Sequence, residues 1–519
     1  MRTTLAALLA PAVLALAACG GGGSGGGRDP QTTRSTAATT TTTATAPGRP
    51  STGTPRAGGA GGATGRPRAG AAAADWPLFG RTPDRANASD APTGITRASV
   101  RRLRRTVLHV PGTVDSSPIF LHDVRVRGAR RDVFVVTTTY GRTMALDARD
   151  GARLWTFTPP GIGGWAGTPQ ITNASPAADP DRRWVFAASP DGRVHKLSLA
   201  RGREAGGRWP VTITRDPTHE KLTASFNVSG PLLVVATGGY IGDAPPYQGH
   251  VVTIARASGR IVAVFNSLCA DRHRVIRPST CPSSASAIWA RSGAVVQPGT
   301  RRLLVATGNA PWNGRTDWGD SVLVLSPDAR RLLGHWTPRD QAQLAATDAD
   351  LGSTAPALLG GGRALQSGKD AKLRVLSLRR TFAAGGRPVL GGEVQTLPAP
   401  GAQGVFTAPA VWRHGGRTTV FVTTAAGTAA YDVRAGRLVR RWANAAAGTS
   451  PVVAGGLLYV QDPNGGLNVY RPASGRRVAR LATGPGHWQS PVVAGGRILV
   501  AEGDANDHAT TGTLSLFRP

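Results

Sequence analysis

Short apolar runs separated by glycine-rich turns recur along the chain from residue 116 to the C-terminus. Each unit opens with small residues, usually a proline, and then an apolar run. The six clear openings are SSPIF (116–120), GTPQI (167–171), STAPAL (353–358), TAPAVW (407–412), TSPVV (449–453) and QSPVV (489–493). Two weaker copies, SFNVSG (225–230) and SAIWARSG (286–293), fill the gap. Eight openings at this spacing predict a repeat architecture.

Further apolar runs follow each opening. In the first unit these are the β-branched run DVFVVTT (132–138) and the run GRTMALD (141–147). Seven units add a fourth run, usually after a glycine, as in GARLWTF (151–157) and GREAGGRW (202–209). The eighth unit lacks it, and LRRTVLHV (103–110) could supply it from the other end of the chain. With no sustained helical period, the pattern predicts an all-β, eight-bladed β-propeller closed by an N-terminal strand, with seven blades as the rival count.

The N-terminus has a different character. Residues 5–18, LAALLAPAVLALAA, match the apolar core of an export signal and are too short to span a membrane. Leu16-Ala17-Ala18-Cys19 followed by Gly20 resembles the bacterial lipobox, which implies a signal peptide over 1–19 and a lipidated Cys19. An ordinary signal peptide with a chance cysteine is the alternative. Residues 20–75, rich in Gly, Thr and Pro, predict a flexible tether, and 76–519 the propeller.

The charge and the cysteines of the chain narrow the ligands and partners that we expect for it. The net charge is +31, but the arginines are scattered without a long basic block, so we expect no nucleic-acid partner. Cys269 and Cys281 share one loop, and export exposes them to oxidising conditions, which favours a disulfide between them. Zinc is disfavoured because only His273 lies nearby and no second cysteine pair exists.

One motif carries a family resemblance. The segment from Ala145 to Trp155 reads A-L-D-A-R-D-G-A-R-L-W, similar to the tryptophan-docking pattern of quinoprotein dehydrogenases and related pyrroloquinoline quinone (PQQ) propellers. Asp147 and Gly151 suit a tight turn, and Trp155 offers a broad ring to the next blade. Non-enzymatic propellers share this motif, so it indicates the fold and not an activity.

More specific resemblances lie in the fourth and fifth units. Trp289 matches the tryptophan beneath the quinone, and Asn309 in ATGN matches the asparagine that coordinates calcium in the dehydrogenases. Asp348 in TDAD takes the place of their general base, and Lys369 in SGKD that of a basic residue at the quinone oxygens. Asp115 occupies the place of an acid that touches the cofactor. The resemblance therefore implies PQQ and calcium as cofactors.

The sequence also departs from that family. It has no adjacent cysteines to form a ring over the cofactor, and no C-x-x-C-H for a c-type haem. The calcium-binding glutamate expected in the third unit is missing from Gly238 to Asp243. Asp243 could substitute, which gives Asn309, Asp348 and Asp243 as the expected metal ligands. Polar clusters at 216–221 and 502–508 are interpreted as ordinary loop polarity.

Two functions remain open from the sequence. One is a lipid-anchored, PQQ- and calcium-dependent dehydrogenase that oxidises an alcohol or sugar and passes electrons to an acceptor. The other is a non-catalytic scaffold that binds protein partners in the cell envelope, like the lipoprotein propeller that assists outer-membrane protein assembly. In both, we expect an exported monomer anchored to the outer face of the cell membrane or cell envelope.

Overall fold

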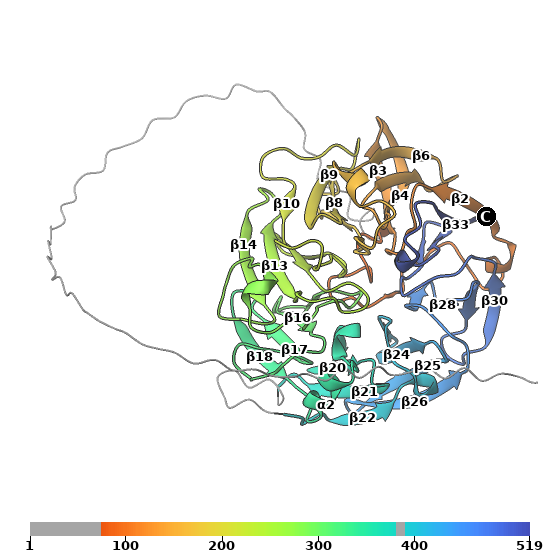
Figure 1. Ribbon diagram of the computed structural model, residues 1–519. Coiled ribbons are helices and arrows are strands. Elements are labelled where there is room, and N and C mark those ends of the chain that lie inside the picture. The colour runs from red at the N-terminus through yellow and green to blue at the C-terminus, as the bar shows by residue number, and fades with distance from the viewer. Residues whose placement is uncertain (1–73, 380–389) are drawn as a thin grey trace, which may run out of the picture. The chain divides into compact units, whose positions relative to one another are not determined.

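Eight antiparallel sheets surround a central axis in the computed structural model (Figure 1). It describes residues 74–379 and 390–519, which belong to one compact unit. The prediction of an eight-bladed all-β propeller is confirmed, and the rival count of seven is wrong. The signal peptide, the lipidated Cys19 and nearly all of the tether lie outside the described residues.

Each blade has four strands in chain order from the axis outward, except that the outer strand of blade eight comes from the N-terminal part of the chain. The strands of blades one to four are β3 (Ile119–Val126), β4 (Ala129–Thr137), β5 (Thr143–Asp147), β6 (Arg153–Phe157); β7 (Ala177–Ala178), β8 (Trp184–Ser189), β9 (Arg193–Ser198), β10 (Val211–Thr212); β11 (Asn227–Ser229), β12 (Leu232–Ala236), β13 (His250–Ala255), β14 (Ile261–Asn266); and β15 (Val295–Val296), β16 (Leu303–Ala306), β17 (Val322–Leu325), β18 (Leu332–Trp336).

The strands of blades five to eight are β19 (Ala357–Gly360), β20 (Arg363–Ser367), β21 (Lys372–Ser377), β22 (Gln395–Pro398); β23 (Ala410–His414), β24 (Arg417–Thr424), β25 (Gly427–Arg434), β26 (Arg437–Asn444); β27 (Val452–Ala454), β28 (Leu457–Gln461), β29 (Leu467–Tyr470), β30 (Arg477–Leu481); and β31 (Val492–Ala494), β32 (Arg497–Ala501), β33 (Gly512–Arg518), β2 (Arg104–Val110). A short strand, β1 (Ala88–Ser89), runs parallel to β27 and adds a fifth strand to blade seven.

The ring closes as the sequence predicts. Strand β2 pairs antiparallel with β33, from Arg104 opposite Arg518 to Val110 opposite Gly512. Three details differ from the prediction. The first strand of blade two, Ala177–Ala178, follows the predicted opening 167–171 instead of lying within it. The outer strand of blade two lies at Val211–Thr212 and not at 202–209, where only Glu204 forms an isolated bridge to Leu197. The first strand of blade four follows the segment 286–293 instead of lying within it.

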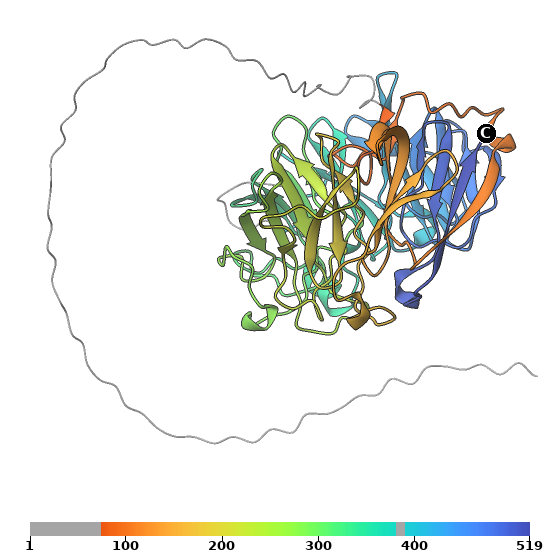
Figure 2. The same cartoon turned by 90° about the horizontal axis from the view of Figure 1, so that it is seen from above.

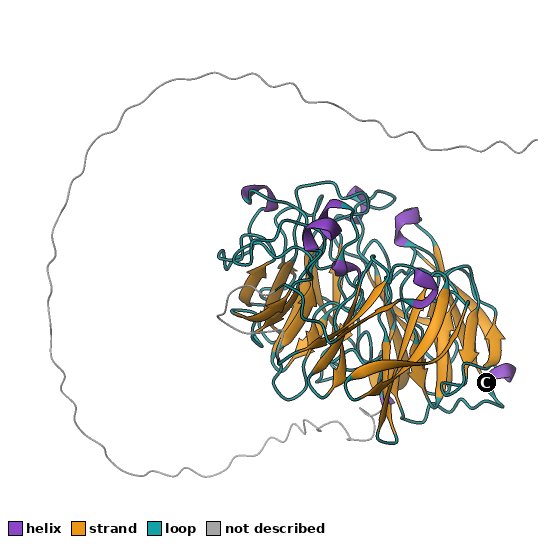
Figure 3. Ribbon diagram, turned by 90° about the horizontal axis from the view of Figure 1, so that it is seen from below, coloured by secondary structure: helices purple, strands orange, loops and turns teal. Residues whose placement is uncertain are grey.

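Short helices connect the strands. They are α2 (Gln341–Ala346) and the 3-10 turns η1 (Val100–Arg102), η2 (Ile162–Gly164), η3 (Pro278–Thr280), η4 (Leu351–Ser353), η5 (Pro400–Ala402) and η6 (Ala505–Asp507). Most of them lie on one side of the sheets, among the long connections (Figure 3). Across residues 74–379 and 390–519, no helix has the length and apolar character needed to cross a membrane.

Neighbouring blades pack through tryptophans on their outer strands. Trp155 is 3% exposed, and its Nε1 donates to the carbonyl of Leu199 in blade two at 2.8 Å. A Cβ on Gly202 would lie 2.4 Å from the Trp155 ring, and this glycine has φ +68°, so a side chain is excluded twice over. Trp442 repeats the arrangement on blade seven, with Nε1 donating to Pro472 O. The predicted docking of Trp155 on the next blade is therefore what the structure has.

Hydrogen bonds also join the blades close to the axis, at the small residues that open each repeat. These contacts are Ser490 N to Ser117 Oγ (2.8 Å), Ser117 N to Ser175 Oγ (2.8 Å), Phe226 N to Ser175 O (3.4 Å), Ser225 N to Arg291 O (3.2 Å), Ser353 Oγ to Val405 O (2.8 Å), Ala408 N to Ser450 Oγ (3.0 Å) and Ser450 N to Gln489 O (3.2 Å). Between blades four and five, Trp289 Nε1 donates to Asp350 Oδ2 at 3.2 Å. Backbones that approach this closely leave room only for small side chains.

The segment 75–94, which precedes the closing strand, runs along the innermost strands of the blades. Figure 2 shows the propeller from the side. The segment bonds to blades one, two, three, four, six, seven and eight through Trp76 N to Phe120 O, Ala178 N to Pro77 O, Arg85 to Ser225 O and Phe226 O, Val296 N to Pro83 O, Val411 N to Ala86 O, Val453 N to Asn87 O and Gly496 N to Thr93 O. Arg85 is buried, and burial lowers its pKa to about 9. The segment therefore holds most of the blades together from the axis.

We expect Trp155→Ala to lower the free energy of unfolding by about 3–5 kcal/mol, because it removes a fully packed aromatic ring between two blades. Urea unfolding followed by tryptophan fluorescence and circular dichroism measures the change. The half-buried Trp412, which stacks on His414, is the matched control, and Trp412→Ala should cost clearly less. Equal losses in the two variants would show that blade docking does not depend on Trp155.

Candidate functional site

A cavity of about 240 Å³ opens at the axis on the side of the long connections. Its walls come from the segments that lead into first strands and from the connections between second and third strands. The lining residues are Asn173, Lys221, Thr223, Gly239, Tyr240, Ile241, Gly242, Asp243, Tyr247, Ala287, Trp289, Asn309, Asp348, Asp350, Lys369, Phe406, His487, Trp488 and Asn506. Residues far apart in the sequence thus meet here because every blade sends the same two connections to this side.

Four of the five residues that we expect at the cofactor line this cavity, namely Trp289, Asn309, Asp348 and Lys369, and so does the expected ligand Asp243. Asp115 does not line it. Its side chain is fully buried behind the wall, where it binds Arg291 and His487. The structure therefore brings the predicted set together except for Asp115.

The acidic part of the cavity centres on a lysine held by two carboxylates. Lys369 Nζ lies 2.5 Å from Asp348 Oδ1 and 3.8 Å from Asp350 Oδ2. Burial acts to lower the pKa of Lys369, but Asp350 and Asp348 outweigh it and raise that pKa. The Asp348 side chain is 54% exposed, so its carboxylate faces the cavity. It is thus an accessible base beside a fixed positive charge.

Asp350, the second acid of the pair Asp348 and Asp350, is not among the site residues that the sequence predicts. Its side chain is 3% exposed, Oδ2 accepts from Trp289 Nε1 at 3.2 Å, and Oδ1 has no hydrogen-bond partner among the described residues. Burial raises the pKa of Asp350 to about 7, against the opposing effects of Lys369 and Trp289. A buried carboxylate oxygen without a partner is costly, so this atom calls for a cation or a proton.

Two glycines fix the backbone around this carboxylate. A Cβ on Gly308 would lie 2.7 Å from Asp350 Oδ2, and one on Gly352 would lie 2.6 Å from Gly308 N. The T-G-N segment of blade four and the D-L-G segment of blade five therefore touch backbone to backbone. This contact places Asn309 and Asp350 in the same wall.

The blade-three wall is built differently from the pattern of the dehydrogenase family. Tyr240 to Asp243 form its rim, and Tyr247 Oη donates to Asp243 Oδ1 at 2.6 Å. Burial and the hydrogen bond to Asp243 both raise the pKa of Tyr247, so the phenol stays protonated as a donor. Asp243 is therefore held in the cavity by a local partner, with its second carboxylate oxygen left to face other groups.

Three aromatic rings gather in the cavity. The Phe406 and Trp488 rings stack with centroids 4.8 Å apart, and the Trp289 centroid lies 6.1 Å from Phe406 and 5.7 Å from Trp488. Lys369 Nζ sits 5.4 Å from the Trp289 centroid. The sequence motifs do not point to Phe406 or Trp488 as site residues. Each directly precedes its repeat opening, TAPAVW or QSPVV, and this shared offset would have found them.

An ion-pair cluster stands at the cavity wall, with Asp115 and Arg291 buried behind it and His487 lining the cavity. Arg291 Nη2 donates to both carboxylate oxygens of Asp115, at 2.8 and 2.9 Å, and His487 Nδ1 lies 2.9 Å from Asp115 Oδ2. His487 Nδ1 is also 3.2 Å from Asp504 Oδ1. Burial alone would raise the pKa of Asp115, but Arg291 and His487 lower it well below its usual range. The cluster ties blades one, four and eight to one another.

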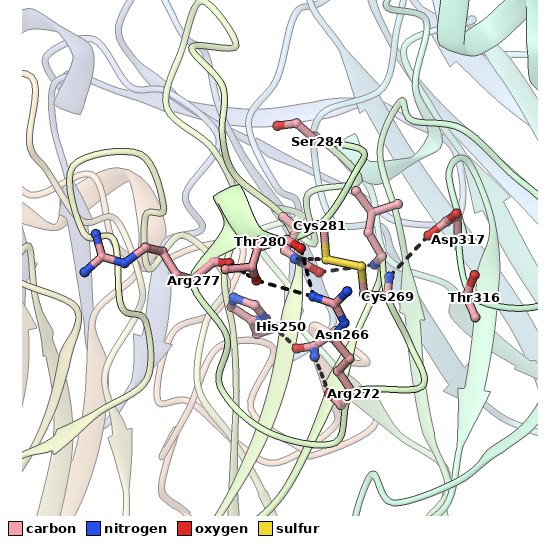
Figure 4. The surroundings of a disulfide bond; sticks show 12 residues. His250, Asn266, Cys269, Arg272, Arg277, Thr280, Cys281, Ser284, Thr316 and Asp317 are labelled. Atoms are coloured by element: carbon pink, nitrogen blue, oxygen red, sulfur yellow. Dashed lines mark hydrogen bonds between the residues drawn. A yellow bond between two sulfur atoms is a disulfide. The ribbon is translucent and has the colours of Figure 1, made fainter. Parts of the chain in front are cut away.

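The disulfide lies beside blade three, at the end of β14 (Figure 4). Cys269 and Cys281 are bonded to each other, and Cys269 N donates to Asp317 Oδ1 at 3.2 Å. Asn266 in the same loop donates to Arg272 O at 2.5 Å and meets His250 Nδ1 through its carbonyl. The loop leads on to Ser284, whose Oγ accepts from Tyr247 N, so it supports the blade-three wall.

The fold is shared with solved PQQ-type propellers. The quinohemoprotein alcohol dehydrogenase ADHIIG from Pseudomonas putida HK5 matches with a TM-score of 0.63 and 15% identity, over 86% of this chain and 80% of that one. A europium-containing methanol dehydrogenase matches at 0.61 and 15%, over 86% and 98%. BamB from Moraxella catarrhalis matches at 0.50 and 12%, over 80% and 97%. At these identities the likeness shows the fold alone.

The protein is thus an eight-bladed propeller of the PQQ-like class. Its sequence matches the family described as outer membrane protein assembly factor BamB over residues 110–295 and 319–480, and the chain belongs to that family of PQQ-like repeats. No curated protein sequence matches it.

Asp320, a second buried carboxylate near the cavity, gives a pH-dependent prediction. It is fully buried, accepts from Leu351 N at 3.2 Å, and burial raises its pKa to about 8. Between pH 3.8 and 8 the folded protein holds a proton that the unfolded chain has lost, so stability falls as pH rises through this range. Asparagine keeps the acceptor and does not titrate.

We therefore expect Asp320→Asn to melt with the wild type near pH 4 and about 2–5 °C above it at pH 8. Thermal unfolding followed by circular dichroism across this range measures the difference. Asp181→Asn, at an exposed turn, is the control and should show no gap that grows with pH. A variant that melts below the wild type at every pH would contradict the prediction.

Proposed function

We propose that this protein is an exported, lipid-anchored quinoprotein that binds PQQ with calcium in the axial cavity and oxidises an alcohol or sugar. The observation that carries the proposal is the buried Asp350 Oδ1, which lacks a partner in a cavity that also holds Asp243, Asn309 and Asp348. A hard cation such as Ca²⁺ prefers this all-oxygen set of carboxylates and an amide carbonyl. The donor chemistry therefore fits the metal that the family resemblance implies.

The remaining walls fit a flat, polar cofactor. Trp289, Phe406 and Trp488 offer aromatic surface, and Lys369 offers a cation beside it. When bound, the quinone supplies the acceptor for the hydride of the alcohol carbon. Asn309, Asp348, Asp350 and Asp243 would hold the metal, and the aromatic rings would face the cofactor.

The chain's own residues would move the proton. Asp348 is the accessible carboxylate, and the contact of its Oδ1 with Lys369 Nζ at 2.5 Å orients it. A carboxylate held in this way suits general-base removal of the proton of an alcohol. Asp350, buried and bonded to Trp289, positions the aromatic ring and lies too deep to reach substrate.

Reconstitution tests the proposal. We expect the purified protein to bind PQQ stoichiometrically with Ca²⁺ in an absorbance titration and to reduce a dye with an alcohol or sugar. Asp348→Asn should keep PQQ binding but lose about 100- to 1000-fold in kcat, as expected for loss of a general base. Asp328→Asn, in the turn between β17 and β18, is the matched control and should change neither value.

If the wild-type protein does not bind PQQ stoichiometrically, with or without Ca²⁺, the dehydrogenase proposal is wrong. Full activity of Asp348→Asn would leave the cofactor in place and remove Asp348 as the base.

A second function, a scaffold for envelope proteins, is favoured by a different observation. Ile241 is 70% exposed at the rim of the cavity, a large apolar side chain left in water beside Gly242. The chain also belongs to the family described as an outer membrane protein assembly factor. In this proposal a tether from a lipidated Cys19 lets the rim search for partners at the membrane.

Photo-crosslinking in intact cells tests this scaffold. A crosslinking residue at Ile241 should capture a discrete envelope protein, whereas one at Val439 on β26, itself 42% exposed, should not. Cys19→Ser should move the protein from the membrane fraction to the soluble fraction and reduce the capture. Identical capture from both positions would count against the scaffold. Retention of Cys19→Ser in the membrane fraction would count against the lipid anchor.

A further inference from the structure

Lys221 differs from the other three lysines of the chain. Lys196 Nζ donates to Arg256 O at 2.7 Å, Lys369 pairs with Asp348, and Lys372 Nζ lies 2.8 Å from Asp340 Oδ2. Lys221 also lines the cavity and is 7% exposed, yet its Nζ has no hydrogen bond or ion pair within the described residues. The nearest group recorded for it is the Tyr240 ring, whose centroid is 5.5 Å away.

Leaving an ammonium group in this position is unfavourable for the protein alone. Burial, and then the charge of Arg291, lower the pKa of Lys221 to about 8, and Asp115 and Asp504 only partly offset them. Asp115 is itself neutralised by Arg291 and His487. A buried cation is kept without a partner only at a cost in stability, so the residue points to a ligand and not to the fold.

The position of Lys221 within the cavity indicates what that ligand offers. Asp350, Asp348 and Asp243 act to raise the pKa of Lys369. Asp115 and Asp504 act to raise the pKa of Lys221. The cavity therefore has a carboxylate-rich side around Lys369 and a separate side where Lys221 Nζ has no ion-pair partner among the described residues. A ligand that fills it would present a metal or a cationic group to the first side and an anionic group to the second.

We propose that Lys221 forms an anion subsite that binds a carboxylate of the ligand held in the axial cavity. This proposal rests on the proposed function, in which the ligand is PQQ, an aromatic tricarboxylate. Lys221 would then orient the quinone from the blade-three side, where the expected glutamate is missing. It is a binding residue and takes no part in the proton transfer.

Binding of PQQ and of its neutral trimethyl ester, followed by quenching of tryptophan fluorescence with Ca²⁺ present, tests the subsite. We expect Lys221→Met to weaken PQQ binding by about 10- to 100-fold, the scale of a charge-assisted hydrogen bond. It should leave ester binding within about threefold of the wild type, and Lys221→Arg should restore most of the PQQ affinity.

Two controls separate binding from structure. Lys196→Met removes an equally buried lysine outside the cavity and should not change affinity for either probe. Lys221→Met should melt at or above the wild type without ligand, because it removes an unpaired buried charge. A lower melting temperature, together with equal loss of affinity for acid and ester, would show a structural role and overturn the proposal.

The outcomes for the subsite and for the cofactor are distinguishable. PQQ binding that is equally tight in Lys221→Met and the wild type overturns the subsite and leaves the quinoprotein proposal standing. If the wild type binds neither probe, the quinoprotein proposal fails, and benzene-1,3,5-tricarboxylate becomes the probe. Binding of this acid that depends on Lys221 supports an anion subsite, and absence of binding overturns it.

Discussion

The hydrogen bonds that pass from blade to blade around the axis constrain everything else in this molecule. They join the small residues at the start of each repeat, for example Ser117 to Ser175 and Ala408 to Ser450. Eight backbones can converge on one axis only if their side chains stay small there, which explains why Ser, Thr, Ala and Pro mark every repeat. Between blades four and five the link is Trp289 to Asp350, so the cavity wall is also part of the frame.

This dual role shapes the chemistry of the cavity. Asp350 is held by a tryptophan and by the close approach of Gly308 and Gly352, so its carboxylate cannot turn away to find another partner. Asp348, two residues earlier, is exposed and paired with Lys369. Neighbouring acids of one chain segment thus meet different surroundings, one rigid and dry and the other accessible. A fold built for packing can in this way present oxygen ligands at fixed positions.

Much of the fold could be predicted from the sequence because strand patterns repeat. The run 103–110 could be recognised as the closing strand since the last repeat lacked its fourth strand. The site was partly predictable, because Trp289, Asn309, Asp348 and Lys369 stand in motifs of known order. The sequence predicts Asp115 at the cofactor, whereas the structure buries it behind the cavity wall, because the sequence pattern does not show that Arg291 binds its carboxylate. Lys221, in a cluster interpreted as loop polarity, could not be assigned because only the ring geometry brings it to the axis.

The N-terminal segment has a consequence for how the molecule is made. Strands β1 and β2 precede every blade in the sequence, yet they pair with β27 and β33 of the last two blades. The native ring therefore cannot form until the C-terminal strand is available, and contacts of such long range form slowly. A chain cut short before β33 would leave β2 and β32 as open sheet edges, exposed to proteases and to other chains. Because β2 pairs with β33, the ring closes only in a polypeptide that extends through β33.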